Sequence, residues 1–166
     1  LVLQMLPTTV NIIPYYLMMD SVGLLNTRAA LIIIYTATNI PFTIWIMKGY
    51  FDTIPRSLDE AAIIDGCTRF RVLRSIILPL SVPGIASAGF LVFLDSWSSF
   101  LVPLVISPAR DVAVMSVGIY NFFGIDFTAY NHAFAASVMS VIPVLVVYLF
   151  AQEYLISGLS SGAEKG

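Results

Sequence analysis

Charged side chains are scarce in this 166-residue chain, and their scarcity argues against an ordinary soluble domain. Asp, Glu, Lys and Arg make up 11% of the residues, against roughly 25% in an average soluble protein. Hydrophobic residues make up 58%, and the mean hydropathy is +0.90. This composition is typical of a protein embedded in a lipid bilayer. The formal net charge of −2 is too small to favour nucleic acid as a partner.

Cysteine and histidine are nearly absent as well. The single cysteine, Cys67, permits neither an internal disulfide nor a metal cluster built on cysteines. The single histidine, His132, has no neighbouring ligand or catalytic partner, so we expect it to pack in a loop or at a helix start. The chain also lacks a P-loop and a Gly-rich phosphate cradle. We therefore expect no catalytic residue, no metal and no cofactor, and any ATP that is used must be hydrolysed by another subunit.

Four apolar segments account for most of the chain. They are long enough to cross a hydrocarbon core of ~30 Å as helices, and lie at about 1–19, 29–47, 84–102 and 133–151. The fold class is therefore predicted to be an all-α integral membrane bundle that forms one transmembrane domain over residues 1–166. The start lacks an initiator Met and a basic leader, so it is not a signal peptide, and we expect the natural N-terminus to be missing.

Prolines interrupt these predicted spans. Pro7 and Pro14 are expected to kink the first span, and Pro143 the last, because proline leaves a carbonyl of the preceding turn without its hydrogen bond. The Asn39-Ile-Pro41 sequence is expected to interrupt the second span near its middle. Asn39 could either offer polar atoms to a passing solute or repair the broken backbone ladder.

The loop at 49–78 carries helix caps rather than a lipid-soluble sequence. Ser57 with Glu60 three residues later is a capping box, which predicts a helix that starts at Leu58. Gly66 is predicted to end that helix in a left-handed conformation, and Thr68 to cap a second helix. The second helix is expected to reach the membrane at an elbow over residues 78–83. The prediction is thus a helical hairpin between two spans.

Basic residues indicate the side on which this hairpin lies. Six of the eight basic residues fall in or beside the hairpin or at the chain end, namely Lys48, Arg56, Arg69, Arg71, Arg74 and Lys165. Because basic residues gather on the cytoplasmic side of a membrane, the hairpin and the C-terminus are predicted to be cytoplasmic. Residues 107–132, with a short helix expected over 112–123, would then lie outside.

Within the hairpin, residues at fixed spacings resemble the EAA signature of membrane subunits of binding-protein-dependent ATP-binding-cassette importers. These are Glu60-Ala61-Ala62, Gly66 six residues after Glu60, Ile76 ten residues after Gly66, and then Leu78-Pro79. The flanking GYFDTIPRSLDEAAIIDG and LPLSVPGI and the ending FAQEYLISGLSSGAEKG resemble the carbohydrate-uptake branch, especially the smaller permease of maltose-type systems. The resemblance covers the C-terminal part of such a permease, which implies that roughly two N-terminal spans are absent.

The resemblance implies a fold, a function and partners. The fold would be the transmembrane domain of a type I importer, in a bacterial or archaeal cytoplasmic membrane. The implied partners are ATP-binding subunits, usually a pair of them, a second permease subunit and an extracytoplasmic solute-binding protein. The short EAA helix would insert into a cleft on the ATP-binding subunit. The residues implied in this coupling are Glu60, Ala61, Ala62, Asp65, Gly66, Ile76, Leu78 and Pro79.

A polar cluster in the third span is the candidate solute path. An ionisable residue inside a span is by default a functional hypothesis, and Asp95 is followed by hydroxyls and an indole that suit a sugar. With Asn39, the candidate residues are Asp95, Ser96, Trp97 and Ser99. A bundle-core Asp, or one near the outer headgroups, would explain Asp95 equally well. The related permeases typically have Trp-Asn where this chain has Trp97-Ser98, so a substrate contact is not carried over from them.

Other functions remain alternatives at this stage. An importer of this kind could carry another small solute, such as glycerol phosphate, a polyol or an osmolyte. A passive channel or a secondary transporter would move its substrate without ATP. A membrane enzyme could use Asp95 with Ser96 or Ser99, but His132 lies outside that span and no nucleophile motif is present. The sequence therefore favours a transport subunit over an enzyme.

Overall fold

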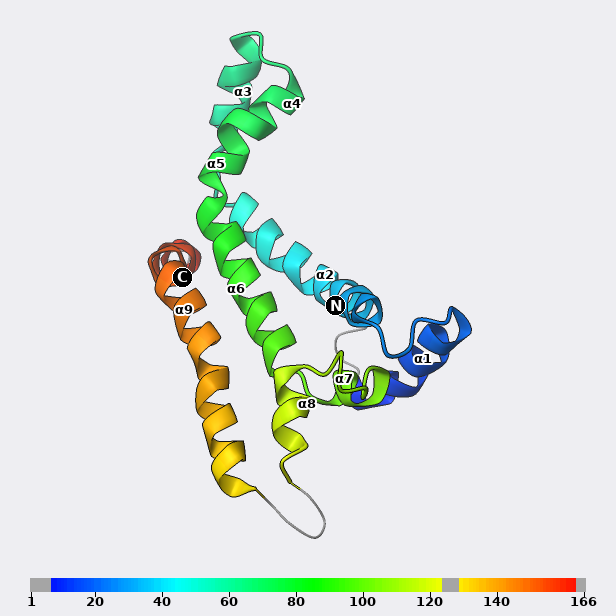
Figure 1. Ribbon diagram of the computed structural model, residues 1–166. Coiled ribbons are helices and arrows are strands. Elements are labelled where there is room, and N and C mark those ends of the chain that lie inside the picture. Colours follow the sequence, from blue (N-terminus) through cyan, green and yellow to red (C-terminus); the bar gives the residue numbers. More distant parts are fainter. Residues whose placement is uncertain (1–6, 124–128, 164–166) are drawn as a thin grey trace. The chain divides into compact units, whose positions relative to one another are not determined.

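The computed structural model describes residues 7–123 and 129–163, and the secondary-structure elements assigned within them are helices. The predicted all-α fold class is confirmed (Figure 1). In chain order the elements are α1 (Thr8–Ser21), α2 (Arg28–Phe51), α3 (Arg56–Ile64), α4 (Arg69–Val72), the π-helix η2 (Leu73–Ile77), α5 (Leu78–Leu80), α6 (Val82–Ser98), α7 (Leu101–Ile106), α8 (Met115–Tyr120) and α9 (Tyr130–Ala163).

Two of the described helices are long and apolar enough to cross a membrane. They are α2, with a mean hydropathy of 1.6, and Tyr130–Leu155 of α9, with 2.3. A third candidate is a bent pair, Arg69–Leu80 with Val82–Ser98, whose axes differ by 67°. The predicted spans at 29–47 and 133–151 lie inside α2 and α9. The span boundaries stay predictions, since length and composition alone mark them.

The expected interruption of the second span is wrong. Helix α2 continues through Pro41 for 24 residues, because a proline inside a long apolar helix removes one backbone hydrogen bond without ending the helix. Pro14 and Pro143 lie inside α1 and α9, and the kinks expected at them stay predictions. Pro7 does not kink α1, because it precedes the first turn as the N-cap residue, where a missing amide costs nothing. Residues 1–6 of the first predicted span lie outside the described residues.

The chain divides into two compact units. The first comprises Leu1–Phe42 with Phe93–Val146, and the second comprises Thr43–Val92 with Val147–Gly166. In the first unit α1 packs on α7. Its core consists of buried apolar side chains from α1, α2 and α7, namely Met19, Ala30, Leu31, Ile34, Val102 and Ile106.

Backbone and side-chain hydrogen bonds fasten the α1–α2 connection to the end of α7. The amide of Asn26, which has a φ of 57°, donates to the Ile106 carbonyl at 2.9 Å. The Asn26 side-chain oxygen accepts from the Ala109 amide at 3.2 Å. The buried hydroxyl of Ser107 donates to the Thr27 carbonyl at 3.2 Å. These contacts hold the beginning of α2, the helix that carries Asn39, against the core of its unit.

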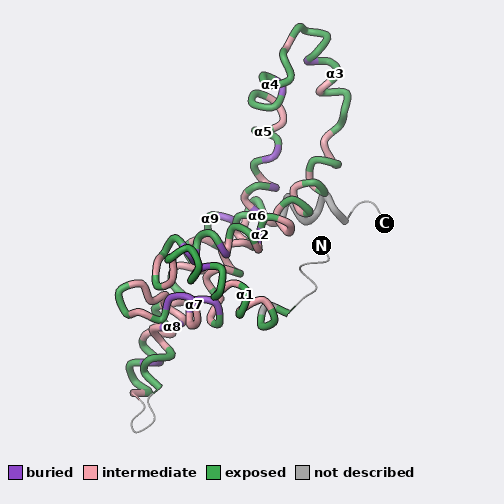
Figure 2. The backbone as a smooth tube through the Cα atoms, turned by 90° about the vertical axis from the view of Figure 1, so that its right-hand side faces the viewer, coloured by how far each residue is buried: buried purple, intermediate pink, exposed green. Residues whose placement is uncertain are grey.

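In the second unit, the end of α2 packs against the beginning of α6. A methyl group built on Gly84 would lie 2.5 Å from the Tyr50 ring, so only glycine allows this approach. The Tyr50 hydroxyl donates to the Leu80 carbonyl at 3.1 Å. Farther along α6, the Ser87 hydroxyl donates to the carbonyls of Pro83 at 2.9 Å and Tyr154 at 3.4 Å. This packing supports the hairpin of α3 and α4, which Figure 2 shows as mostly exposed.

Candidate functional site

The first helix of the hairpin starts earlier than the capping box predicts. Helix α3 begins at Arg56 rather than Leu58, and its N-cap residue is Pro55, which makes no side-chain cap. Pro55 has an extended backbone with φ of −62° and ψ of 128°, the ordinary geometry of a residue that precedes a helix. Ser57 therefore lies exposed inside the first turn. The predicted capping box is wrong, because the proline two residues earlier already fixes where the helix begins.

The predicted end of α3 at Gly66 is confirmed. The φ of Gly66 is +83°, and two hydrogen bonds close the last turn: the Gly66 amide donates to the Ile63 carbonyl and the Cys67 amide to the Ala62 carbonyl, both at 3.0 Å. This pair of bonds is the Schellman motif, in which the residue after the helix is left-handed. Gly66 therefore turns the chain back toward α4.

The second arm of the hairpin is capped as predicted. The Thr68 hydroxyl accepts a hydrogen bond from the Arg71 amide at 3.4 Å, and α4 follows. The helix widens into η2 just before Pro79. The buried Ser81 hydroxyl then donates to the Ile77 carbonyl at 2.6 Å. The expected elbow over residues 78–83 is confirmed, because the 67° bend falls between Leu80 and Val82.

The EAA residues occupy both faces of α3. Ala62 is 6% exposed, whereas Glu60 and Ala61 are exposed to solvent. Because helices α3 and α4 contact each other, the small Ala62 side chain fits the narrow space inside the hairpin. Of the remaining signature residues, Ile76 is partly buried, and Asp65, Gly66, Leu78 and Pro79 are exposed.

Solvent-exposed apolar side chains lie next to the turn of the hairpin. Ile64 is 85% exposed, Phe70 is 72% exposed and Ile63 is 51% exposed. Ile63 and Ile64 were not among the candidate site residues that the sequence predicted. The signal was present in the run AAII next to the predicted helix end, since a water-facing helix end with two isoleucines is unusual unless a partner covers it.

The candidate solute-path residues come together only in part. The Asn39 side-chain amide donates to the Tyr35 carbonyl at 3.0 Å and to an Asp95 carboxylate oxygen at 3.3 Å. Asn39 is 7% exposed, whereas Asp95 is exposed. The structure thus pairs two residues, 56 positions apart, that the sequence proposed separately. It adds Tyr35, whose carbonyl accepts the Asn39 bond and whose hydroxyl is buried.

The other members of the cluster make helix-packing contacts. The Trp97 indole N–H donates to the Ser140 carbonyl at 3.1 Å, and its ring stacks on Phe93 with centroids 5.6 Å apart. The Ser99 carbonyl accepts from the Ser116 hydroxyl at 2.7 Å. Ser96 is partly buried. The N–H and ring of Trp97 therefore serve packing, and Asp95 is the exposed carboxylate of the cluster.

The segment that was predicted to lie outside contains α8, which is shorter than the helix expected over 112–123. His132 stacks on the Phe122 ring, with centroids 5.8 Å apart, as its predicted packing role requires. In residues 7–123 and 129–163, no three His, Cys, Asp or Glu side chains are grouped closely enough to hold a metal ion.

Comparison with known proteins matches residues 1–161 to the family described as binding-protein-dependent transport system inner membrane component. A relative in Thermococcus litoralis, a trehalose/maltose transport system permease protein, is 39% identical over 89% of this chain and 53% of its own length. A maltodextrin transport system permease protein of Bacillus subtilis is 34% identical over 100% of this chain and 60% of its own.

An arabinooligosaccharides transport system permease protein of Halalkalibacterium halodurans is 32% identical over 100% of this chain and 59% of its own length. The chain therefore spans little more than half the length of these relatives. These relatives are transport system permease proteins, and the sequence likewise favoured a transport subunit over an enzyme.

Proposed function

This chain belongs to the family of binding-protein-dependent transport system inner membrane components, and from that membership we propose that it is a transmembrane subunit of an ATP-driven sugar importer. A separate subunit hydrolyses the ATP. The observation that carries the proposal is the EAA hairpin, with Ala61 exposed and Ala62 buried on a helix that a left-handed Gly66 ends. Sugars are favoured because the relatives above are named for maltose, maltodextrin and arabinooligosaccharides.

Helix α3 docks into a cleft of the ATP-hydrolysing subunit. The exposed Ala61 lets a partner backbone approach closely, since a methyl group is the smallest side chain that a helix presents. Ile63, Ile64 and Phe70 supply apolar surface that water covers in the isolated chain and that docking would bury. Glu60 is exposed and available to a basic or amide group at the rim of the cleft.

The hairpin lies on the cytoplasmic side. Arg69, Arg71 and Arg74 are exposed on its second arm, and Lys48 at the end of α2 pairs with Asp52 at 2.7 Å. Basic residues that flank a span on one side favour the cytoplasm for that side. The same reasoning assigns the C-terminus to the cytoplasm and the segment with α8 to the outside, where a solute-binding protein would deliver the sugar. A second permease subunit completes the pathway.

Asp95 and Asn39 contribute to the path of the solute. A carboxylate on α6 cannot face lipid at low cost, yet Asp95 is exposed in this chain. Its exposed oxygen therefore faces either water in the path or a partner subunit. The Asn39 side-chain amide donates to the Tyr35 carbonyl and to Oδ2 of Asp95, so it holds the carboxylate in one orientation. Such a fixed acceptor suits the hydroxyl groups of a sugar.

Reconstitution into proteoliposomes tests the proposal. Uptake of a labelled maltose-type sugar should require the ATP-hydrolysing subunit, ATP and the binding protein together, because the given sequence contains no P-loop that could bind the ATP. Sugar uptake without ATP would instead identify a channel or secondary transporter. If ATP-dependent uptake occurs only with glycerol phosphate, a polyol or an osmolyte, the chain is an importer subunit for a different solute.

A further inference from the structure

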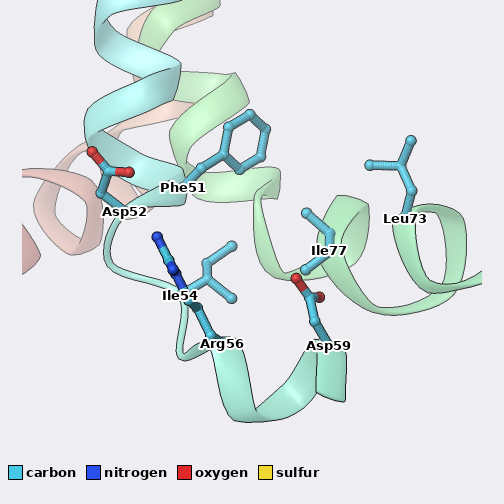
Figure 3. Close-up of a pocket in the computed structure, with 7 residues that line it drawn as sticks. All are labelled: Phe51, Asp52, Ile54, Arg56, Asp59, Leu73 and Ile77. Atoms are coloured by element: carbon cyan, nitrogen blue, oxygen red, sulfur yellow. The ribbon is translucent and has the colours of Figure 1, made fainter. Parts of the chain in front are cut away.

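A hollow of about 360 Å³ lies at the base of the hairpin. It is formed by the last residue of α2, the connection to α3, the first turn of α3 and one side of η2 (Figure 3). The residues that line it are Phe51, Asp52, Ile54, Arg56, Asp59, Leu73 and Ile77. The proposed docking of α3 uses the opposite end of the hairpin and leaves this hollow without a function.

Asp59 gives the hollow an unsatisfied acceptor. One of its carboxylate oxygens, Oδ1, is buried and receives no hydrogen bond from any described residue. In Figure 3 the Asp59 carboxylate rises from α3 toward Ile77, on the inner side of the hollow. A buried carboxylate oxygen that lacks a donor is costly. The hollow is therefore suited to a ligand that brings an N–H or O–H group to Asp59.

Arg56 gives the hollow a separate positive charge. It precedes Asp59 by three residues on the same helix, yet the described residues include no ion pair between the two. Figure 3 shows the Ile54 side chain between the Arg56 guanidinium and the Asp59 carboxylate. Phe51, Leu73 and Ile77 add apolar walls. The ligand that matches this lining has a cation, an anion and an apolar part.

The position along α2 indicates where such a ligand comes from. The 24 residues of α2 make a helix of ~36 Å, which exceeds a hydrocarbon core of ~30 Å but not the full bilayer with its headgroups. Trp45, which is 58% exposed, and Lys48 precede the end of the helix, as interfacial anchors do. The predicted span thus puts Phe51 and Asp52 at headgroup level, where the hollow would open among lipid headgroups.

We propose that this hollow binds the headgroup of a zwitterionic phospholipid that has a primary ammonium, as in phosphatidylethanolamine. The ammonium donates to Asp59, and the phosphate accepts from Arg56. The first methylene groups of an acyl chain lie along Phe51, Leu73 and Ile77. A choline headgroup has no N–H to donate, and a glycerol headgroup has no cation, so both satisfy the site less well.

Native mass spectrometry of the purified protein with added phospholipids of identical acyl chains tests this assignment. The wild type should retain phosphatidylethanolamine about tenfold better than phosphatidylcholine, which is the minimum expected for one hydrogen bond to a charged group. Asp59→Ala should abolish that preference. Arg56→Gln should weaken retention of both lipids while their ratio persists, because both carry the phosphate.

Asp65→Ala is the matched control, because Asp65 is an exposed carboxylate at the other end of α3 and lies outside the hollow. Its lipid preference should equal that of the wild type. Equal retention of the two lipids by the wild type would overturn the assignment, as would a lost preference in Asp65→Ala. If the wild type shows no preference and Asp59→Ala weakens assembly with the ATP-hydrolysing subunit, the occupant is a side chain of that subunit instead. If Asp59→Ala does not fold, the assignment is still tested by two measurements. They are the ratio of phosphatidylethanolamine to phosphatidylcholine retained by the wild type and the retention of both lipids by Arg56→Gln.

Discussion

Gly66 adopts a backbone conformation that residues with a side chain rarely adopt. Its φ is +83°, and a methyl group added there would meet nothing within 4 Å. A substitution therefore acts through the backbone alone. An L-residue in this region costs about 1 kcal/mol or more, and the cost falls on the turn that joins the two arms of the hairpin.

Gly66→Ala should loosen this turn without unfolding the protein. We expect the Cys67 amide, which donates to the Ala62 carbonyl, to exchange with solvent about fivefold faster, as a loss of about 1 kcal/mol implies. Hydrogen exchange measured by mass spectrometry over residues 62–68 reports this change. Gly49→Ala is the control: Gly49 lies inside α2 with open space around it, so exchange in the hairpin should stay as in the wild type.

Asp95 differs from the other residues of its cluster because it combines exposure with a fixed orientation. Asn39 holds one carboxylate oxygen at 3.3 Å, whereas Trp97 and Ser99 use polar atoms for helix packing. We expect Asp95→Ala to raise the KM of sugar uptake about five- to tenfold, the effect of one lost hydrogen bond. ATP hydrolysis stimulated by the binding protein should change little.

Uptake kinetics in proteoliposomes measure both quantities. Glu153→Ala removes an exposed carboxylate from α9 and should leave the KM unchanged. A wild-type KM in the Asp95→Ala variant would show that this carboxylate serves helix packing or an interface, not the solute.

The junction of α2 and α6 depends on one close approach. Gly84 is buried, and a Cβ atom there would lie 2.5 Å from the Tyr50 ring. Gly84→Val should therefore destabilise the protein by about 1–3 kcal/mol, the usual cost of overpacking. The thermal unfolding temperature of the purified protein measures the loss.

Gly89→Val is the matched control on the same helix. Gly89 is exposed, and a Cβ atom there meets nothing within 4 Å. Its unfolding temperature should stay near that of the wild type. The double variant Gly84→Val with Tyr50→Ala should recover part of the lost stability, because the ring that clashes is gone. Equal stability of the two valine variants would contradict the close contact.

Local signals predicted the helices better than they predicted the contacts between them. The Gly66 stop and the Thr68 cap were predictable, because each depends on residues within one turn. The capping box at Ser57 failed, since Pro55 already defines the start of α3. The Asn39–Asp95 bond could not be predicted, because it joins residues on different helices and no local pattern records that proximity.

Other contacts of the candidate site and its supporting helices also had no signal in the sequence. Tyr35 lies one helical turn before Asn39 and accepts the hydrogen bond of its side-chain amide, but a tyrosine in an apolar span has no distinctive sequence signal. Only glycine fits at position 84 against the Tyr50 ring, and this requirement likewise depends on how α2 and α6 approach each other. Composition and caps therefore identified the membrane class and the hairpin, and tertiary packing decided which polar residues meet.

Many large apolar side chains of this chain face outward. On α9, Phe150 is 77% exposed, Val138 is 68% exposed and Phe134 is 66% exposed. In water such a surface would drive aggregation, whereas lipid or a neighbouring subunit covers it in a membrane assembly. The exposed apolar end of the hairpin differs, because the exposed charged residues Asp65, Arg69 and Arg71 adjoin it in the sequence, and the proposed protein partner would cover it.

The ratio of sugar imported to ATP hydrolysed, measured in proteoliposomes for Ala61→Trp, tests the central claim most directly. The indole should keep α3 from its cleft, so uptake should fall more than about tenfold, as a clash of more than 1.4 kcal/mol implies. ATP hydrolysis should continue, so the ratio of sugar imported to ATP hydrolysed should fall as far as uptake does. Ala29→Trp, at an exposed alanine at the start of α2, should keep the wild-type ratio, and both variants should reach the membrane in normal amounts. A wild-type ratio in Ala61→Trp would contradict the docking of this hairpin.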